Sequence, residues 1–102
     1  MGTGLKDDSW VWVIVQNPGA GEQFLGQHDT ETDVSFIPAF LEKEEAGQGL
    51  KRLVRDQKGT YEIQAIQVDH LAQEAERNGF QVFLLNGEGT LLEKILPADP
   101  LH

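Results

Sequence analysis

The sequence predicts an α+β (mixed α/β) fold, in which a single mixed β-sheet of about five to six strands carries two α-helices packed on one face. Residues 10–16 read WVWVIVQ, a run of β-branched and aromatic residues typical of a strand buried on both faces. Residues 61–85 follow the order strand, helix, strand, which is typical of a crossover between parallel strands. Hairpins before and after this unit make the predicted sheet mixed.

The first half of the chain contains three apolar segments separated by turn-forming residues. We expect strands over 10–16, 23–27 and 34–40, with a polar turn over 28–33. Pro38 interrupts the third segment, and proline has no N–H to donate to a β-ladder. The third strand is therefore expected either to end at Pro38 or to have an unpaired edge there.

Two helices are expected. The first spans 41–57, and Gly47 and Gly49 each weaken it by about 1 kcal/mol relative to alanine. The second begins at Asp69, a favourable N-cap residue, and ends at residues 78–79, which read Asn-Gly. Strands are expected over 61–68, 80–85 and 90–96, the last two joined by a glycine-containing turn.

Length and charge exclude several classes of protein. The chain has 102 residues, which predicts a single domain over 1–102 with flexible termini at 1–9 and 97–102. A formal net charge of −9 argues against binding to nucleic acid or to an anionic membrane surface. The chain contains no cysteine, which suits a reducing compartment, and we expect a cytoplasmic protein.

A glycine-rich loop follows the first strand. Asn17, Gly19 and Gly21 could bring backbone N–H groups close to a small ligand or a phosphate. Together with residues 86–90, the loop resembles the paired glycine-rich loops of lipid kinases of the diacylglycerol kinase type. The second loop departs from that pattern, because Asn86 and Glu88 stand where the family has glycine and aspartate. Two ordinary turns are the simpler interpretation.

Other polar residues give no convincing catalytic or metal site, and we expect no cofactor. His70 and Glu74 are four residues apart on the second predicted helix, a spacing that suits a shared metal or a solvated helix face. The polar segment 28–33 contains His28 and three acidic residues but lacks the glycine and closing glutamate of a calcium loop. Neither Ser9 nor Ser35 has a neighbouring histidine in the sequence, so no serine nucleophile is expected.

Trp10 and Trp12 are the candidate interaction surface. They are two residues apart on a predicted strand and so point to the same face of the sheet. If a helix covers that face, both indoles belong to the core. If the face is open, they form an apolar patch suited to a protein partner.

The order of features resembles the N-terminal domain of the SseB (enhanced serine sensitivity) family. The resemblance rests on residues 36–40, which read FIPAF and run into a glutamate-rich helix, on the helix 69–79 and on the strand 80–86 with its glycine turn. A cyanobacterial domain family of unknown function is a weaker alternative. The resemblance carries no catalytic residues over and implies a non-enzymatic role in bacterial cytoplasm.

The sequence therefore predicts a small bacterial protein-interaction or scaffolding module, with another protein or a second copy as partner. The alternative is a small-ligand or phosphate-binding domain that uses the loop containing Asn17, Gly19 and Gly21.

Overall fold

The computed structural model describes residues 5–53 and 55–95. The expected tail 97–102 and residues 1–4 of the expected flexible N-terminus lie outside the described residues. Seven strands and two helices follow one another in this order: β1 (Trp10–Gln16), β2 (Gln23–Phe24), β3 (Gln27–Asp29), β4 (Val34–Phe40), α1 (Lys43–Leu50), β5 (Tyr61–Gln67), α2 (Val68–Arg77), β6 (Gln81–Leu85) and β7 (Leu91–Ile95).

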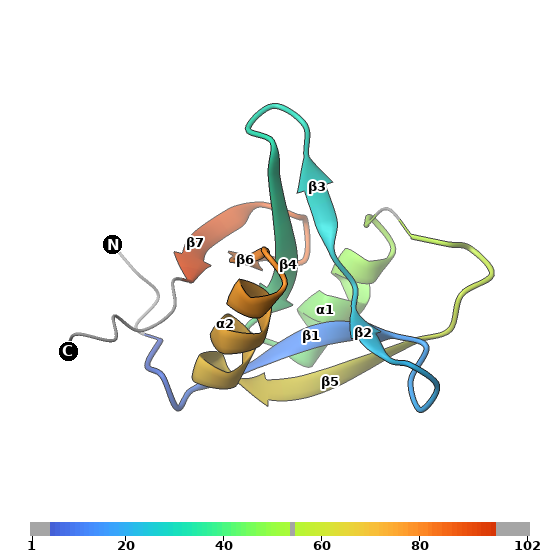
Figure 1. Ribbon diagram of the computed structural model, residues 1–102, viewed down its shortest axis with the longest axis horizontal. Coiled ribbons are helices and arrows are strands. Elements are labelled where there is room, and N and C mark those ends of the chain that lie inside the picture. The colour runs from blue at the N-terminus through green and yellow to red at the C-terminus, as the bar shows by residue number, and fades with distance from the viewer. Residues whose placement is uncertain (1–4, 54, 96–102) are drawn as a thin grey trace.

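All seven strands belong to one mixed sheet, as predicted, although the strand count exceeds the expected five to six. Every residue of β1 pairs with β5 along one edge, so β2 and β4 must share the other edge of β1. The main strand order is therefore β5-β1-β4-β6-β7. The short strands β2 and β3 lie between β1 and β4, where these two strands diverge (Figure 1).

Pro38 lies at the point of divergence. On one edge of β4, pairing with β3 ends at Phe36 and pairing with β1 begins at Ala39. The proline falls in this gap, so neither β3 nor β1 pairs with it on this edge, while on the other edge it lies opposite Phe83 of β6. The strand continues through Pro38 to Phe40, so the expectation of an unpaired edge is confirmed and that of a strand end is wrong.

The crossover differs from the sequence expectation. β5 and β6 run in the same direction, but β1 and β4 lie between them in the sheet. The parallel partner of β6 is β4, with Ile37 opposite Val82. α2 therefore carries the chain across two intervening strands, a distance that local sequence patterns do not encode.

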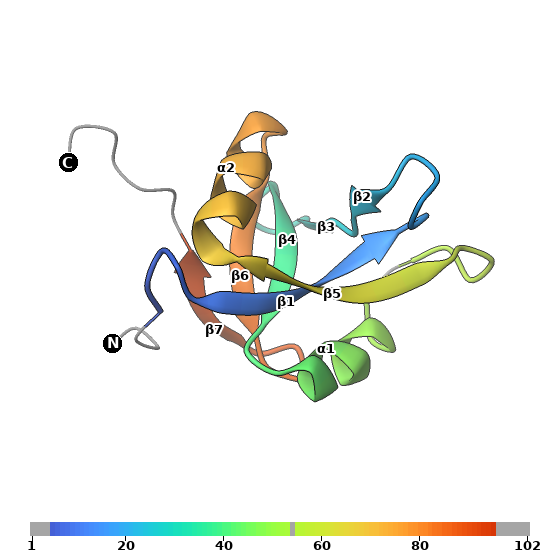
Figure 2. The same ribbon diagram turned by 90° about the horizontal axis from the view of Figure 1, so that it is seen from below.

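The two helices lie on opposite faces of the sheet, which corrects the prediction of two helices on one face (Figure 2). β1 decides this, because its side chains alternate and both sets are apolar. Val13 packs with Leu71 and Ala75 of α2, whereas Ile14 packs with Ala46 of α1. The continuous apolar run in β1 is therefore covered on both sides.

α1 is shorter than expected, eight residues against a predicted span of 41–57. Its two buried positions are Ala46 and Gly49. A Cβ added at Gly49 would lie 2.5 Å from Cζ of Phe40. This glycine therefore allows close packing of the helix on β4, a role that the sequence pattern did not reveal.

The N–H groups at the start of α2 donate hydrogen bonds to backbone carbonyl oxygens of the preceding segment. The N-cap position is Gln67 and no side chain caps it, so the expected N-cap role of Asp69 is wrong. The N–H of Val68 donates to the carbonyl oxygen of Ser9 at 2.9 Å, and the N–H of Asp69 donates to that of Asp7 at 2.9 Å. The segment before β1 thus takes the place of a capping side chain.

Candidate functional site

The two tryptophans of β1 have different environments. Trp12 is partly buried in the core beneath α1, where the Lys43 ammonium lies 5.7 Å from the centre of its ring. Trp10 is on the same face of β1 but is 60% exposed. The interpretation as core therefore suits Trp12, and the interpretation as an open apolar patch suits Trp10.

The loop between β1 and β2 has the backbone shape that its sequence suggests. Asn17, Gly19 and Gly21 all have positive φ, between 55° and 78°. The N–H of Gly19 donates to the Glu22 carboxylate at 3.3 Å, and that of Ala20 donates to the carbonyl oxygen of Asn17 at 3.0 Å. The loop leads into a strand rather than a helix, and a carboxylate occupies its concave side, so its contacts do not favour an anionic ligand.

The second glycine-containing loop lies far from the first. Asn86 Oδ1 accepts hydrogen bonds from the N–H groups of Glu88 and Thr90, at 2.9 and 3.0 Å. β1 and β6 run in opposite directions, so the loops that follow them lie at opposite ends of the sheet. The geometry therefore does not bring the two loops together around one phosphate.

The helix residues His70 and Glu74 lie on the surface. Glu74 forms an ion pair with Arg77 at 2.8 Å, and His70 is exposed. Within residues 5–53 and 55–95, no group of three or more histidine, cysteine or acidic residues is arranged to hold a metal ion. A solvated helix face accounts for His70, whereas Glu74 also lines a cavity beside α2.

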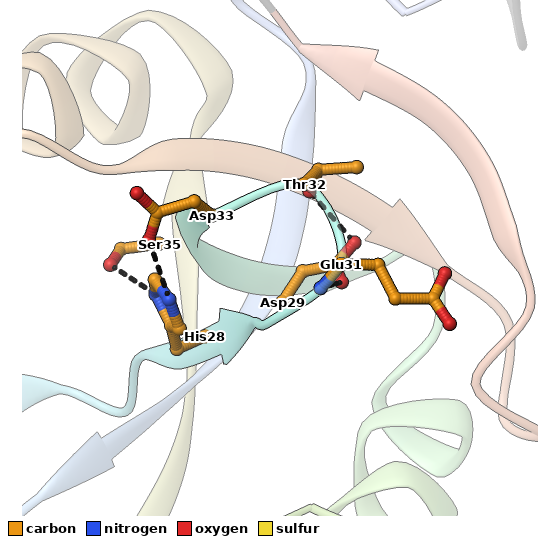
Figure 3. Close-up of polar contacts among 6 residues, drawn as sticks. All are labelled: His28, Asp29, Glu31, Thr32, Asp33 and Ser35. Atoms are coloured by element: carbon orange, nitrogen blue, oxygen red, sulfur yellow. Dashed lines mark hydrogen bonds and ion pairs between the residues drawn. The ribbon is translucent and has the colours of Figure 1, made fainter.

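The β3–β4 hairpin contains a polar cluster that the sequence analysis missed (Figure 3). His28 lies opposite Ser35 in the strand register, and its Nδ1 is 3.0 Å from the Ser35 Oγ. Its Nε2 is 3.1 Å from Oδ1 of Asp33. The expectation that Ser35 has no histidine neighbour is therefore wrong, because antiparallel pairing brings together residues that are seven apart in the chain.

The His28 ring has two partners in this cluster. The Ser35 hydroxyl and Nδ1 form a hydrogen bond whose donor depends on the imidazole tautomer, and Nε2 lies at ion-pair distance from the Asp33 carboxylate. A serine–histidine–carboxylate relay has the same order of groups. However, the side chains of His28 and Asp33 are 46% and 92% exposed, so water competes for each of these bonds. We interpret the cluster as a contact that holds the hairpin together.

Asp29 closes the tip of the same hairpin. Its carboxylate accepts a hydrogen bond from the Thr32 hydroxyl at 2.9 Å and another from the N–H of Glu31 at 3.0 Å. Both bonds favour the ionised form, and they lower the pKa of Asp29 below its ordinary value of 3.8. The hydroxyl of Thr32 contributes most to this shift.

A cavity of about 630 Å³ lies on the face of the sheet that carries α2. Its walls come from β1, β2, β4, β5 and the C-terminal part of α2, and they comprise Val13, Val15, Gln16, Glu22, Gln23, Phe24, Ile37, Gln64, Ala65, Ile66, Glu74, Asn78 and Phe80. Phe80 also borders a smaller hollow beside His28 and Ser35. Gln64, a polar residue opposite Val13 in the strand register, is a sequence feature that could have indicated a partly open sheet face.

No family model, curated protein or solved structure matches this chain. The resemblance to the SseB family therefore stays a prediction. Neither helix in the described part of the chain has the length and apolar character needed to cross a membrane.

Proposed function

We propose that this protein is an interaction module that pairs an extended segment of a partner protein with the outer edge of β5. The open edge of this strand carries the proposal. β5 is seven residues long and pairs with β1 along its whole length without a bulge. Within the described residues, its other edge has no strand partner. Such an edge offers roughly three outward-facing pairs of backbone N–H and C=O groups.

The sequence of β5 lacks the usual protection against edge pairing. Proteins often block exposed edges with lysine, proline, bulges or very short strands. β5 reads YEIQAIQ and has one charged residue, Glu62. The strand at the opposite end of the sheet, β7, has five residues, an irregular register beside Leu85, and the charged pair Glu93 and Lys94. β5 is thus the better template for an added strand.

Side chains beside β5 offer an apolar contact for the partner. Ala65 lies opposite Trp12 in the register, and Gln67 lies opposite Trp10. Because Ala65 carries only a methyl group, side chains of an added strand can reach towards the indoles on this face. Exposed tryptophan is a common anchor in protein interfaces. The net charge of −9 favours a partner segment that carries lysine or arginine.

The proposal is tested by selecting displayed random linear peptides on the folded protein and mapping the selected peptides by amide NMR. We expect shift changes along residues 61–67 and at the indole N–H of Trp10. Peptides that are N-methylated at alternate residues should lose binding, because strand addition needs their backbone N–H groups. Sedimentation over a range of concentrations shows whether a second copy takes the same place.

Two lysine substitutions provide a matched pair. Ala65→Lys places a charge on the edge strand and should weaken peptide binding at least fivefold, whereas Ala20→Lys adds the same charge in an exposed loop and should not. The proposal fails if selected peptides shift residues outside β5 and β1. It also fails if no peptide binds and the protein stays monomeric at millimolar concentration.

A further inference from the structure

The cavity beside α2 has the size of a small-molecule site. Its volume of about 630 Å³ falls within the range of roughly 300–1,000 Å³ that is usual for organic ligands. It lies where α2 ends, because the ten-residue helix covers one part of the sheet face and leaves the part near Val15, where Phe24 and Phe80 also line the cavity. The cavity shares Gln64, Ala65 and Ile66 with β5, the strand of the proposed pairing edge, but the inference does not depend on the proposed function.

The lining divides into an apolar base and a polar rim. Valine, isoleucine and phenylalanine side chains form the base: Val13, Val15, Phe24, Ile37, Ile66 and Phe80. Two primary amides, Gln64 and Asn78, belong to the rim on this face, and Gln16 and Gln23 border the cavity where β1 and β2 end, although strand alternation places their side chains on the Ile14 face. This combination suits a ligand with an apolar body and a polar head, because the base excludes water and the amides orient hydrogen-bonding groups.

The charged residues of the rim indicate which charge the polar head group of the ligand should carry. Glu22 and Glu74 line the cavity, and no lysine or arginine does. Arg77 forms an ion pair with Glu74 at 2.8 Å, but the Arg77 side chain is 70% exposed, so solvent and salt screen its charge. An anion would meet two lining carboxylates and no lining cation, whereas an ammonium group could also donate hydrogen bonds to the amide carbonyl oxygens.

Contacts within the rim hold these groups in place. The Gln16 amide donates to Oε1 of Gln23 at 3.3 Å, which ties β1 to β2 at the mouth of the cavity. Asn78 Nδ2 donates to the carbonyl oxygen of Glu74 at 2.8 Å, which fixes its amide at the end of α2. Each of these bonds uses one position of a primary amide and leaves others for a ligand.

We propose that this cavity binds a small organic cation with an apolar body, such as a protonated arylalkylamine. The test uses three probes of similar shape: phenethylamine, which is positively charged, 2-phenylethanol, which is neutral, and 3-phenylpropanoate, which is negatively charged. Methyl and amide NMR spectra of the folded protein are recorded during titration to millimolar concentrations. We expect the methyl signals of Val13, Val15, Ile37 and Ile66 to shift, with the amine binding about fivefold more tightly than the alcohol and the carboxylate binding weakest.

The double substitution Glu22→Gln and Glu74→Gln keeps the shape of the rim and removes its charge. The amine should then bind no more tightly than the alcohol. The matched control is Glu76→Gln, an exposed residue of α2 that does not line the cavity, and it should leave the preference unchanged. The proposal is overturned if the carboxylate binds as tightly as the amine, if none of the probes shifts these methyl signals, or if the double variant keeps the preference.

Discussion

Gly49 of α1 rests directly on the ring of Phe40, the last residue of β4. A Cβ at position 49 would lie 2.5 Å from Cζ and 2.6 Å from Cε1 of that ring. Phe40 is fully buried, so the ring has little room to move away. The distance between α1 and the sheet therefore depends on this glycine.

Gly49→Ala is expected to lower the free energy of unfolding by about 1–3 kcal/mol, because the added methyl group overpacks the core against Phe40. Gly47→Ala is the matched control on the same helix, since its Cβ would meet only Cδ1 of Ile63 at an ordinary 3.8 Å. Better helix propensity should make that variant about 0.5–1 kcal/mol more stable. Urea unfolding measures the free energy of unfolding of both variants. Equal changes at positions 47 and 49 would contradict the packing argument.

Asn86→Ala should destabilise the β6–β7 hairpin. The Asn86 side chain accepts two backbone hydrogen bonds, and losing both should lower the free energy of unfolding by about 1–2 kcal/mol. Asn86→Asp keeps an acceptor oxygen and should retain most of the stability at neutral pH. Thermal and urea unfolding measure the stability of the two variants. Equal losses would mean that the acceptor oxygen is not what stabilises the turn.

The pH dependence of the β3–β4 hairpin follows from Asp29. Hydrogen bonds from Thr32 and from the N–H of Glu31 lower its folded-state pKa below 3.8. Its contribution to stability is therefore complete above pH 3.8 and is lost as the pH falls through the lower folded value. A ¹³C NMR titration of the carboxyl group should show this lowered pKa.

Thr32→Val should bring the pKa of Asp29 back towards its ordinary value, because it removes the largest cause of the shift. Thr30→Val removes a neighbouring hydroxyl that does not contribute to the shift and serves as the control. If Asp29 has the same pKa in the two variants, the hydroxyl of Thr32 does not stabilise the ionised carboxylate of Asp29.

Fluorescence quenching should distinguish the two tryptophans. In a Trp12→Phe variant the remaining indole, Trp10, is 60% exposed and should be quenched strongly by acrylamide. In Trp10→Phe the remaining indole, Trp12, is packed in the core beneath α1 and should be quenched at least twofold less. Stern–Volmer constants that do not differ would show that α1 does not shield Trp12.

Local sequence patterns were enough to place the longer strands and the second helix, whereas β3 overlaps the segment 28–33 that was expected to be a polar turn. Residues 10–16, 34–40 and 81–85 are apolar runs whose strand character depends only on their own side chains and the turns that bound them. The mixed sheet and the turn at Asn86 followed from the same local rules. The first helix was overestimated, because an apolar stripe continues past Leu50 although the regular helix ends there.

The tertiary structure decided what those patterns leave open. Whether two helices share a face depends on how far each crossover travels, and α2 passes over β1 and β4 before the chain returns as β6. The histidine–serine contact at Ser35 needs the hairpin register, and the cavity takes its walls from β1, β2, β4, β5 and α2. By itself, the sequence determined which segments form the longer strands and the second helix, since that choice depends on neighbouring residues. The faces, the open edge of β5 and the cavity arise from contacts between distant segments, which only packing in three dimensions specifies.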